Sequence, residues 1–253
     1  MNILILGGTA EARALAGALA GRKDLSVTVS LAGRTAEPAP QPVPVRVGGF
    51  GGADGLARYL RDEQIDALID ATHPYAGIIS ANAAYAAERT GVPLLALRRP
   101  PWTKVAGDTW IEVATVEDAV EALGKTPRRV FLALGRKELQ PFAAAPQHIY
   151  LVRSVDPVDP PLAVPHATYI AARGPFTEEE DYALLERHRI ETIVAKNSGG
   201  AATYGKIGAA RALRLPVIML KRPALPDVPS AETVEEVLAW LDHALTLSTA
   251  RGV

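Results

Sequence analysis

Two adjacent glycines near the N-terminus have the spacing to bind an anion. The segment Gly7–Ala12 follows an apolar run and precedes an Ala/Leu-rich helical pattern. Glycines at such a turn let backbone approach a ligand, a threonine can cap the helix, and the free N–H groups at its start attract a phosphate. Thr9 and Ala12 replace the later glycines of the dinucleotide fingerprint G-x-G-x-x-G, so a purely structural turn is the alternative. The residues expected to bind a dinucleotide are Gly7, Gly8, Thr9, Ala10 and Glu11.

The residues after the next apolar run favour a phosphorylated dinucleotide. The segment Ser30–Thr35 carries an arginine and two hydroxyls, and no acidic residue follows until Glu37. A site for NAD usually has an acid here for the ribose 2′-hydroxyl, whereas a guanidinium pairs with a 2′-phosphate through two parallel hydrogen bonds. We therefore expect NADPH as the cofactor, and a solvated loop arginine is the alternative. The residues expected to bind it here are Ser30, Gly33, Arg34 and Thr35.

A third candidate for the cofactor site is a loop of four glycines around one aromatic residue. It spans Gly48–Gly52 and follows a proline-flanked run at 41–47. Glycines allow backbone to bend closely around a ligand, and Phe50 offers a flat face. Gly49 and Phe50 are therefore expected in the cofactor site, and a loop that contacts no ligand is the alternative.

A polar cluster follows the apolar run 67–71. In Asp70–Ala76, His73 and Tyr75 are candidate proton donors, and Thr72 adds a hydroxyl that we assign to the cofactor site. In open α/β sheets, ligands bind at the edge where parallel strands end, which is where this cluster is expected. The alternative is that His73 only caps the next helix and that Tyr75 packs.

A second polar cluster follows the apolar run 192–195. Lys196 is a third candidate proton donor, and it precedes Asn197, Ser198 and two glycines. Cationic side chains beside the start of a helix favour a carboxylate or phosphate ligand, and a structural turn is the alternative. The residues expected to bind the substrate are Arg136, Lys196, Asn197, Ser198, Gly199, Gly200, Thr203 and Lys206.

Further cations follow other expected strands, in a chain whose net charge is only −1. Their gathering at one sheet edge indicates an anionic ligand, although several are expected to be ordinary solvated side chains. They are Arg98, Arg99, Lys137, Arg153, Arg173, Lys221 and Arg222.

These residues need parallel sheets to bring them together. Short apolar runs alternate with longer helical patterns, which is typical of βαβ units. We expect strands at 2–6, 25–31, 41–47, 67–71, 93–97, 130–134, 148–152, 168–171, 192–195 and 217–220. We expect helices at 10–21, 55–63, 76–89, 115–123, 137–144, 177–188, 201–213 and 230–247.

The pattern restarts after Pro100 and Pro101, which predicts two domains. Residues 1–100 are expected to bind NADPH, and residues 101–253 to contribute the substrate site. The predicted fold is α/β, with two Rossmann-like domains whose mostly parallel sheets face each other across a cleft. The helix 230–247 can pack on either half.

Composition excludes several classes of protein. The chain has 253 residues and no cysteine, which removes disulfides and thiolate metal sites. The near-zero net charge argues against nucleic-acid binding, and the short apolar runs argue against a membrane span, so we expect a soluble cytoplasmic protein. The five histidines lack H-x-x-x-H spacing, so no metal site is expected. The serine-hydrolase elbow, the phosphate-binding P-loop and the Tyr-x-x-x-Lys pair of short-chain dehydrogenases are all missing.

Together the motifs resemble the precorrin-6A reductase family of corrin biosynthesis. The matching segments are 5–12, 30–34, 48–52, 70–76 and 195–200. The resemblance implies a two-domain enzyme in which NADPH reduces a carbon–carbon double bond of precorrin-6A to give precorrin-6B. It also implies a polycarboxylate tetrapyrrole substrate, which would suit the distributed cations, and it allows contact with neighbouring pathway enzymes.

The resemblance leaves several choices open. Solvent or a substrate carboxyl group could supply the proton in place of His73, Tyr75 or Lys196. The substrate could be metal-free or contain cobalt. Two other functions are a non-catalytic NADP(H)-binding module and a reductase of another small anionic substrate.

Overall fold

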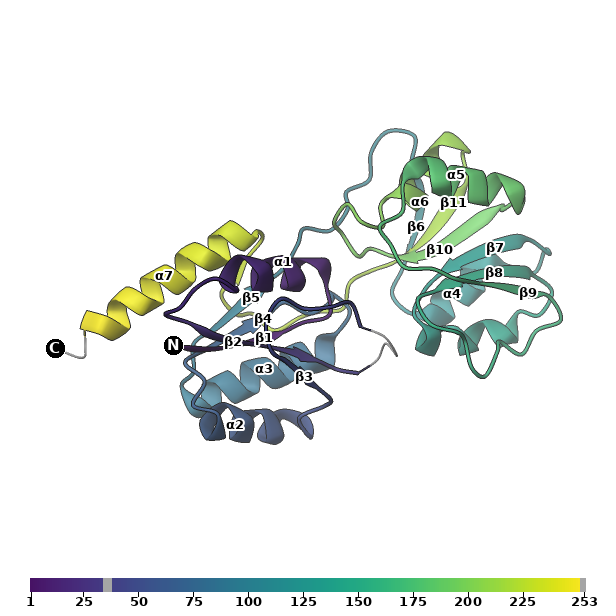
Figure 1. Ribbon diagram of the computed structural model, residues 1–253. Helices are drawn as coiled ribbons and strands as arrows, with labels where there is room; N and C mark the ends of the chain where they lie inside the picture. Colours follow the sequence, from purple (N-terminus) through teal and green to yellow (C-terminus); the bar gives the residue numbers. More distant parts are fainter. Residues whose placement is uncertain (34–37, 251–253) are drawn as a thin grey trace. The chain divides into compact units, whose positions relative to one another are not determined.

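The computed structural model describes residues 1–33 and 38–250 and divides the chain into two compact units (Figure 1). Unit 1 comprises Met1–Arg99 together with Pro223–Val253, and unit 2 comprises Pro100–Arg222. The expected second domain, 101–253, therefore extends too far toward the C-terminus. The segment from Pro223 onward belongs to unit 1 because it adds a strand and a helix there.

Unit 1 contains a six-stranded sheet in which every described pairing is parallel. Its strands are β1 (Asn2–Leu6), β2 (Ser26–Leu31), β3 (Val45–Val47), β4 (Ala67–Asp70), β5 (Leu94–Leu97) and β12 (Ser230–Ala231). Its helices are α1 (Ala10–Leu19), α2 (Gly52–Asp62), α3 (Gly77–Thr90) and α7 (Val234–Ala250). The strand order is β12-β5-β4-β1-β2-β3.

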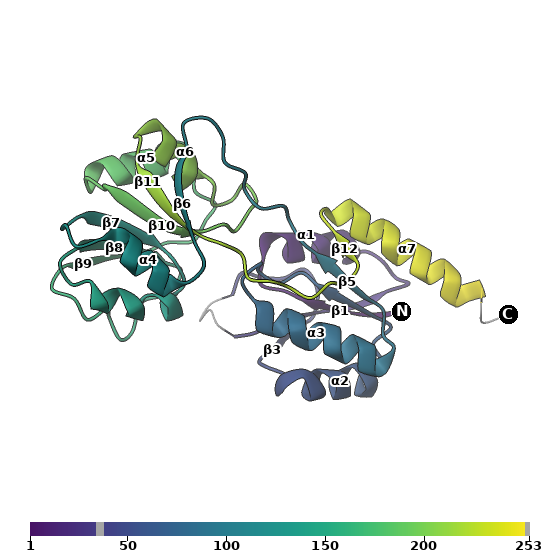
Figure 2. The ribbon, with the colours of Figure 1, turned by 180° about the vertical axis from the view of Figure 1, so that it is seen from behind.

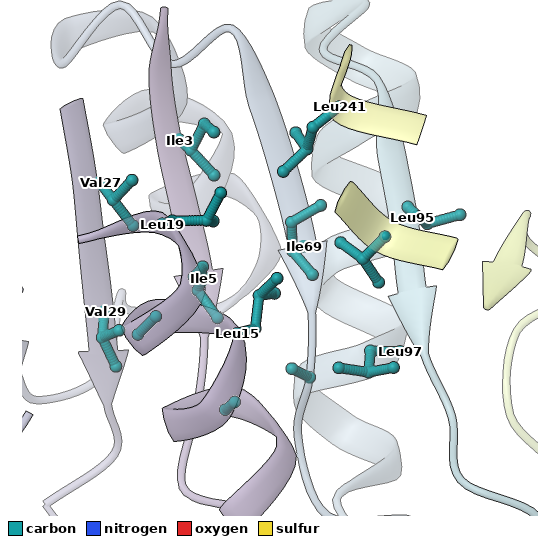
Figure 3. Close-up of a cluster of buried hydrophobic side chains, with 14 of the residues drawn as sticks. Ile3, Ile5, Leu15, Leu19, Val27, Val29, Ile69, Leu95, Leu97 and Leu241 are labelled. Atoms are coloured by element: carbon teal, nitrogen blue, oxygen red, sulfur yellow. The ribbon is translucent and has the colours of Figure 1, made fainter. Parts of the chain in front are cut away.

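Helices cover both faces of this sheet (Figure 2). On one face, Leu15 and Leu19 of α1 and Leu241 of α7 pack against Ile5 and Ile69 of the sheet (Figure 3). On the other face, α2 and α3 cover the alternate residues of the same strands. Each large aliphatic side chain buried in this way contributes about 1.5–3 kcal/mol. Burial on both faces explains why β1 and β4 are apolar at consecutive positions.

Unit 2 contains a second six-stranded sheet, again with only parallel pairings among the described residues. Its strands are β6 (Thr109–Val113), β7 (Arg129–Ala133), β8 (Ile149–Ser154), β9 (Ala167–Ala171), β10 (Thr192–Lys196) and β11 (Pro216–Leu220). Its helices are α4 (Val116–Leu123), α5 (Glu178–Arg187) and α6 (Gly205–Ala212), with short 3₁₀ segments η1 (Arg136–Glu138) and η2 (Gln140–Ala144). α5 and α6 pack on one face through Leu185 and Ile207. α4 contacts β11 and η2.

Both sheets have the strand order of a dinucleotide-binding Rossmann fold, 3-2-1-4-5-6. In unit 1, the sixth position in the sheet belongs to β12, which is the last strand in the sequence. In unit 2, the sixth position belongs to β6, although β6 precedes the other five strands of that unit in the sequence. The predicted α/β class with two Rossmann-like domains is therefore confirmed.

Four elements differ clearly from the sequence-based expectation. β6 and β12 were not expected, because β6 is an exposed edge strand and β12 has only two residues. The helix expected at 137–144 is two 3₁₀ segments, with Pro141 at the start of the second, where it donates no backbone hydrogen bond. The helix expected at 201–213 begins only at Gly205.

Candidate active site

The sheet of unit 1 reverses its strand order between β1 and β4. α1 follows β1 on one face, and α3 follows β4 on the other, so the two connections diverge at the carboxyl ends of neighbouring strands. Ligands of open α/β sheets bind at such a reversal. The segments that begin there are the glycine turn after Leu6 and the polar cluster after Asp70.

The glycine turn is crowded at one residue and open at the next. A Cβ on Gly7 would lie 2.9 Å from Cγ1 of Val29, so only glycine fits without movement. Gly8 has a φ of +112°, and beyond its chain neighbours no atom of the described residues lies within 4 Å of the Cβ position. The turn therefore exposes backbone at Gly8, directly before the N-terminus of α1.

Thr9 links the two strand-to-helix segments that begin at the reversal, one after β1 and one after β4. Its Oγ1 accepts a hydrogen bond from the amide of Ala12 at 3.0 Å, which caps α1, and donates to the carbonyl of Ala71 at 2.8 Å. The amides of Ala10 and Glu11 precede the first hydrogen bond within the helix, which Arg13 donates to Thr9. This is the backbone that the sequence analysis assigned to the dinucleotide.

Glu11 places a negative charge in the first turn of α1, beside the backbone that is expected to bind a phosphate. An N–H of Arg99, which follows β5, donates to its carboxylate at 2.7 Å. Both side chains are largely buried, with 27% of the Glu11 side chain and 16% of the Arg99 side chain exposed. The pair offsets the charge of Glu11 and places a guanidinium beside the glycine turn.

Arg46 of β3 shapes the glycine-rich loop around Phe50. Its guanidinium donates to the carbonyl oxygens of Gly48 and Gly49 at 2.6 and 2.7 Å. It also lies 3.8 Å from the centroid of the Phe50 ring, and Tyr59 contacts the same ring edge to face. The Phe50 ring is therefore packed on both of these neighbours, and the loop has a defined shape.

The end of β2 is only partly described. The Ser30 hydroxyl is buried and accepts a hydrogen bond from Arg46 at 3.2 Å. Gly33 adopts a φ of +69°. Arg34 and Thr35, which the sequence assigned to the 2′-phosphate, lie outside the described residues.

The polar residues at the end of β4 form an internal network. Asp70 is buried and accepts hydrogen bonds from the hydroxyl and amide of Thr72, at 2.6 and 3.2 Å. The same hydroxyl lies 3.4 Å from the Ser80 hydroxyl of α3. This network holds the connection that begins after β4 in place.

His73 and Tyr75 lie together in the turn before α3. Nδ1 of His73 accepts a hydrogen bond from the amide of Tyr75 at 3.3 Å, and the two ring centroids are 5.7 Å apart. Because Nδ1 accepts, the neutral ring carries its proton on Nε2. The N-cap of α3 is Ala76, and the His73 ring bonds within the turn that precedes it.

Unit 2 has its own reversal, between β7 and β10. There the ammonium of Lys196, at the end of β10, forms an ion pair with Glu138 of η1. The other carboxylate oxygen of Glu138 accepts from the amide of Gly135 at 2.8 Å. Arg136, in the same segment, is more exposed and donates to the carbonyl of Pro157.

The loop after Lys196 is held by side chains that face inward. The Asn197 amide group accepts from the amide of Trp102 at 2.7 Å and donates to the Trp102 carbonyl at 2.9 Å. Arg222 donates to the carbonyls of Asn197 and Ser198 at 2.9 and 3.0 Å. A Cβ on Gly199 would lie 2.1 Å from the carbonyl oxygen of Pro100. The Asn197 side chain thus shapes the loop, and its expected contact with substrate stays a prediction.

Lys206 of α6 lies in the interior of unit 2. It is 4% exposed, donates to the carbonyl of Thr203, and lies 4.8 Å from the Trp102 ring centroid. Burial and the nearby Arg153 charge lower the pKa of Lys206 to about 7, against a smaller opposing effect of Asp181. The first turn of α6 thus directs the ammonium of Lys206 into the interior, and its expected contact with substrate stays a prediction.

An open pocket of about 430 Å³ lies beside the same loop. Gly200 and the aromatic side chains of Trp102, Phe176 and Tyr204 are among its lining residues. Across the described parts of the chain, no group of three or more acidic or histidine side chains could hold a metal ion. No helix between residues 1 and 250, as far as the structure describes them, is long and apolar enough to cross a membrane.

A family model described as precorrin-6x reductase CbiJ/CobK matches residues 2–242. The chain belongs to the precorrin-6x reductase family. Among related members, a Sinorhizobium protein named precorrin-6A reductase is 57% identical over 244 residues, covering 96% of this chain and 94% of the relative. A Rhodobacter capsulatus protein of the same name is 50% identical, covering all of this chain and 99% of the relative.

A solved structure of this precorrin-6x reductase family, titled CobK precorrin-6A reductase, has the same fold. Its TM-score is 0.92 at 49% identity, and the match covers 96% of this chain and 97% of that one. A Priestia megaterium relative named cobalt-precorrin-6A reductase is 32% identical, covering 98% of this chain and 99% of the relative. The family resemblance found in the sequence motifs is thus confirmed.

Some residues that shape this family member's sites were missed by the sequence analysis or given no specific role. Arg46 and Glu138 lie within three residues of motifs that were singled out, but neither belongs to a glycine turn or a polar strand end. Arg99 and Arg222 were grouped only as strand-end cations, and their partners, Glu11 and the 197–198 carbonyls, are distant in sequence. Only the parallel pairing of the strands brings these groups together.

Proposed function

We propose that the protein is an NADPH-dependent precorrin-6A reductase of cobalamin biosynthesis and that its product is precorrin-6B. The observation that carries this proposal is the open glycine turn at the β1/β4 reversal, in a chain of the precorrin-6x reductase family. Fold alone would not define the activity, because Rossmann-like folds support many functions. The family adds the substrate class, and the turn adds the cofactor class.

We assign the metal-free macrocycle as the substrate. Relatives that are 41–57% identical to this chain are named precorrin-6A reductase. Relatives at 27–32% identity are named cobalt-precorrin-6A reductase. The greater similarity therefore supports a substrate without cobalt.

The residues of unit 1 fit a dinucleotide diphosphate. Gly8 leaves open space beside the first amides of α1, and Arg99 adds a guanidinium that Glu11 orients. Backbone amides at a helix start bind phosphate oxygens well. When bound there, NADPH supplies a hydride to a carbon–carbon double bond of the macrocycle.

The residues of unit 2 fit a ligand with many carboxylates. Lys196 lies at the end of β10 with Glu138 as its partner, and Arg136 lies exposed in η1. The aromatic side chains around the nearby pocket offer flat apolar surface to a macrocycle. Ser198, Gly199 and Gly200 remain candidates for backbone or hydroxyl contacts, because this loop directly follows Lys196.

Reduction of the double bond needs a proton as well as a hydride. His73, Tyr75 and Lys196 are the candidate donors. The Nε2 proton of His73 is the more defined of these, since Nδ1 already accepts the Tyr75 amide. Solvent or a substrate carboxyl group remains an alternative source of the proton.

The experiment is a single-turnover reaction with precorrin-6A and NADPH deuterated at nicotinamide C4. We expect oxidation of one NADPH per macrocycle and a product heavier by one deuterium and one solvent hydrogen, measured by mass spectrometry. The same reaction with NADH should be much slower. The matched substrate control is cobalt-precorrin-6A.

Three outcomes would contradict parts of the proposal. Tight NADPH binding without turnover on either macrocycle would indicate a non-catalytic NADP(H)-binding module. Turnover only with the cobalt macrocycle would overturn the assignment of the substrate. Equal rates with NADH would overturn the assignment of the cofactor.

A further inference from the structure

Arg46 lies beside the end of β2, where a Rossmann fold contacts the ribose 2′-group of a dinucleotide. In the β2/β3 pairing, Arg46 is directly opposite Ser30, at the carboxyl end of β2. That strand end is where a Rossmann fold distinguishes a 2′-hydroxyl from a 2′-phosphate. No acidic residue occurs between Ser26 and Gly33 to bind a 2′-hydroxyl.

The partners of Arg46 hold its guanidinium without cancelling its charge. They are the carbonyls of Gly48 and Gly49, the Ser30 hydroxyl and the rings of Phe50 and Tyr59. None of these groups is a carboxylate, and no ion pair of Arg46 occurs among the described residues. The positive charge is therefore fixed in place and remains available to an anion.

Arg46 also keeps hydrogen-bond donors for a ligand. A guanidinium has five N–H groups. Three hydrogen bonds, to Ser30, Gly48 and Gly49, leave two of them without a partner in the part of the chain that the structure describes. Two donors on one guanidinium match two oxygens of a phosphate.

We propose that Arg46 determines the preference of unit 1 for a 2′-phosphorylated dinucleotide. It contacts the 2′-phosphate with its remaining N–H groups and holds the Gly48–Phe50 loop in shape for the adenosine end. This inference rests on the proposed function, because it concerns the same cofactor site. It adds a strand residue to the group that the sequence predicted for this specificity, Arg34 with the Ser30 and Thr35 hydroxyls.

The test measures the dissociation constants of NADPH and NADH for the full chain and for Arg46→Gln, with folding checked by circular dichroism. We expect Arg46→Gln to lower the NADPH/NADH affinity ratio about tenfold or more, because a charge-assisted pair with phosphate is lost. The control is Arg58→Gln, which removes the same charge from an exposed position on α2 and should leave the ratio unchanged. Arg34→Gln measures how much Arg34 contributes to the same NADPH/NADH affinity ratio.

A second variant and a second ligand pair keep the test decisive. Arg46→Lys keeps the charge but not the forked donors, so its ratio should fall by about threefold. Titration with 2′,5′-ADP and 5′-AMP repeats the comparison on the adenosine end alone. An unchanged ratio in both Arg46 variants would overturn the inference. Equal losses for NADPH and NADH would also overturn it, because Arg46 would then act only on loop shape.

The failure of this inference can be told apart from failure of the proposed function. If the unmodified chain binds neither dinucleotide, the cofactor assignment itself is wrong. If the unmodified chain prefers NADPH and the Arg46 variants keep that preference, only the role of Arg46 is wrong.

Discussion

Thr9 has two hydrogen bonds with different purposes. One caps α1, and the other joins the glycine turn to the connection after β4. We expect Thr9→Ala to destabilise unit 1 by about 1 kcal/mol through the lost cap and to weaken NADPH binding about fivefold. Thr9→Ser should restore most of both properties. Hydrogen exchange of α1 and a fluorescence titration with NADPH measure the two effects.

The matched control is Thr115, which caps α4 of unit 2 in the same way. Thr115→Ala should lower the protection of α4 by a similar free energy without changing NADPH binding. If Thr9→Ala leaves NADPH binding unchanged as well, Thr9 acts only as a helix cap.

The lowered pKa of Lys206 predicts that the stability of unit 2 depends on pH. Its pKa is lowered from 10.5 to about 7 in the folded chain, so the unfolded chain binds more protons between these values. With respect to this group, the free energy of unfolding of unit 2 is therefore highest above pH 10.5, and it decreases as the pH falls toward 7. We expect the free energy of unfolding to increase by on the order of 2 kcal/mol from pH 7 to 9 through this group.

Lys206→Met should remove this pH dependence and stabilise unit 2 at pH 7, since a buried charge is replaced by an apolar group of similar length. Urea unfolding followed through Trp102 and Trp110, at several pH values, gives the measurement. A slope that is the same in Lys206→Met as in the unmodified chain would contradict the assignment to Lys206.

At the scale of elements, two glycines bring α6 against the start of α5. A Cβ on Gly205 would lie 2.5 Å from the backbone carbonyl oxygen of Thr177, whereas the atoms nearest to a Cβ on Gly208 belong to the side chain of Glu178. Backbone cannot move away easily, but an extended carboxylate side chain can. We expect Gly205→Ala to destabilise unit 2 by about 1–3 kcal/mol and Gly208→Ala to be close to neutral. Thermal unfolding of the two variants compares them directly, and equal effects would contradict this view of the packing.

The elements were predictable where burial on both faces leaves a strong pattern. The strand 2–6 agrees with β1 at both ends, and the Gly91 that ends α3 was visible as a helix stop. β6 and β12 were not predictable, because exposed or very short edge strands bury too few apolar residues. Their places depend on pairing with β11 and β5, which is non-local information.

The candidate site was predictable in its backbone and less so in its side chains. The glycine turn and both polar strand ends lie at the strand-order reversals, as parallel strands require. The partners Glu138 of Lys196 and Arg99 of Glu11 were not identified, because each lies more than fifty residues away along the chain. The burial of Lys206 was not predictable, because it depends on α6 beginning only at Gly205, which directs the side chain inward.

At the scale of the whole molecule, α7 completes unit 1 from beyond unit 2 in the sequence. Leu241 is fully buried against the sheet, together with Ile69, Leu95 and Leu97 (Figure 3). We expect Leu241→Asp to lower hydrogen-exchange protection throughout unit 1 while α5 and α6 of unit 2 keep theirs. The control is His243→Asp on the exposed side of the same helix. Equal loss of protection in both units would show that they unfold together.

Because β12 and α7 come late in the sequence, they also determine the order in which the two units can fold during translation. Residues 100–222, all of unit 2, emerge between the fifth and sixth strands of unit 1. Unit 2 can therefore finish folding from a continuous stretch of nascent chain. Unit 1 begins first and is completed last, and until then α1 alone packs on the sheet face that it shares with α7. About 140 residues separate Leu97 from Leu241, so the part of the face that α7 covers lacks this helix for roughly ten seconds of translation.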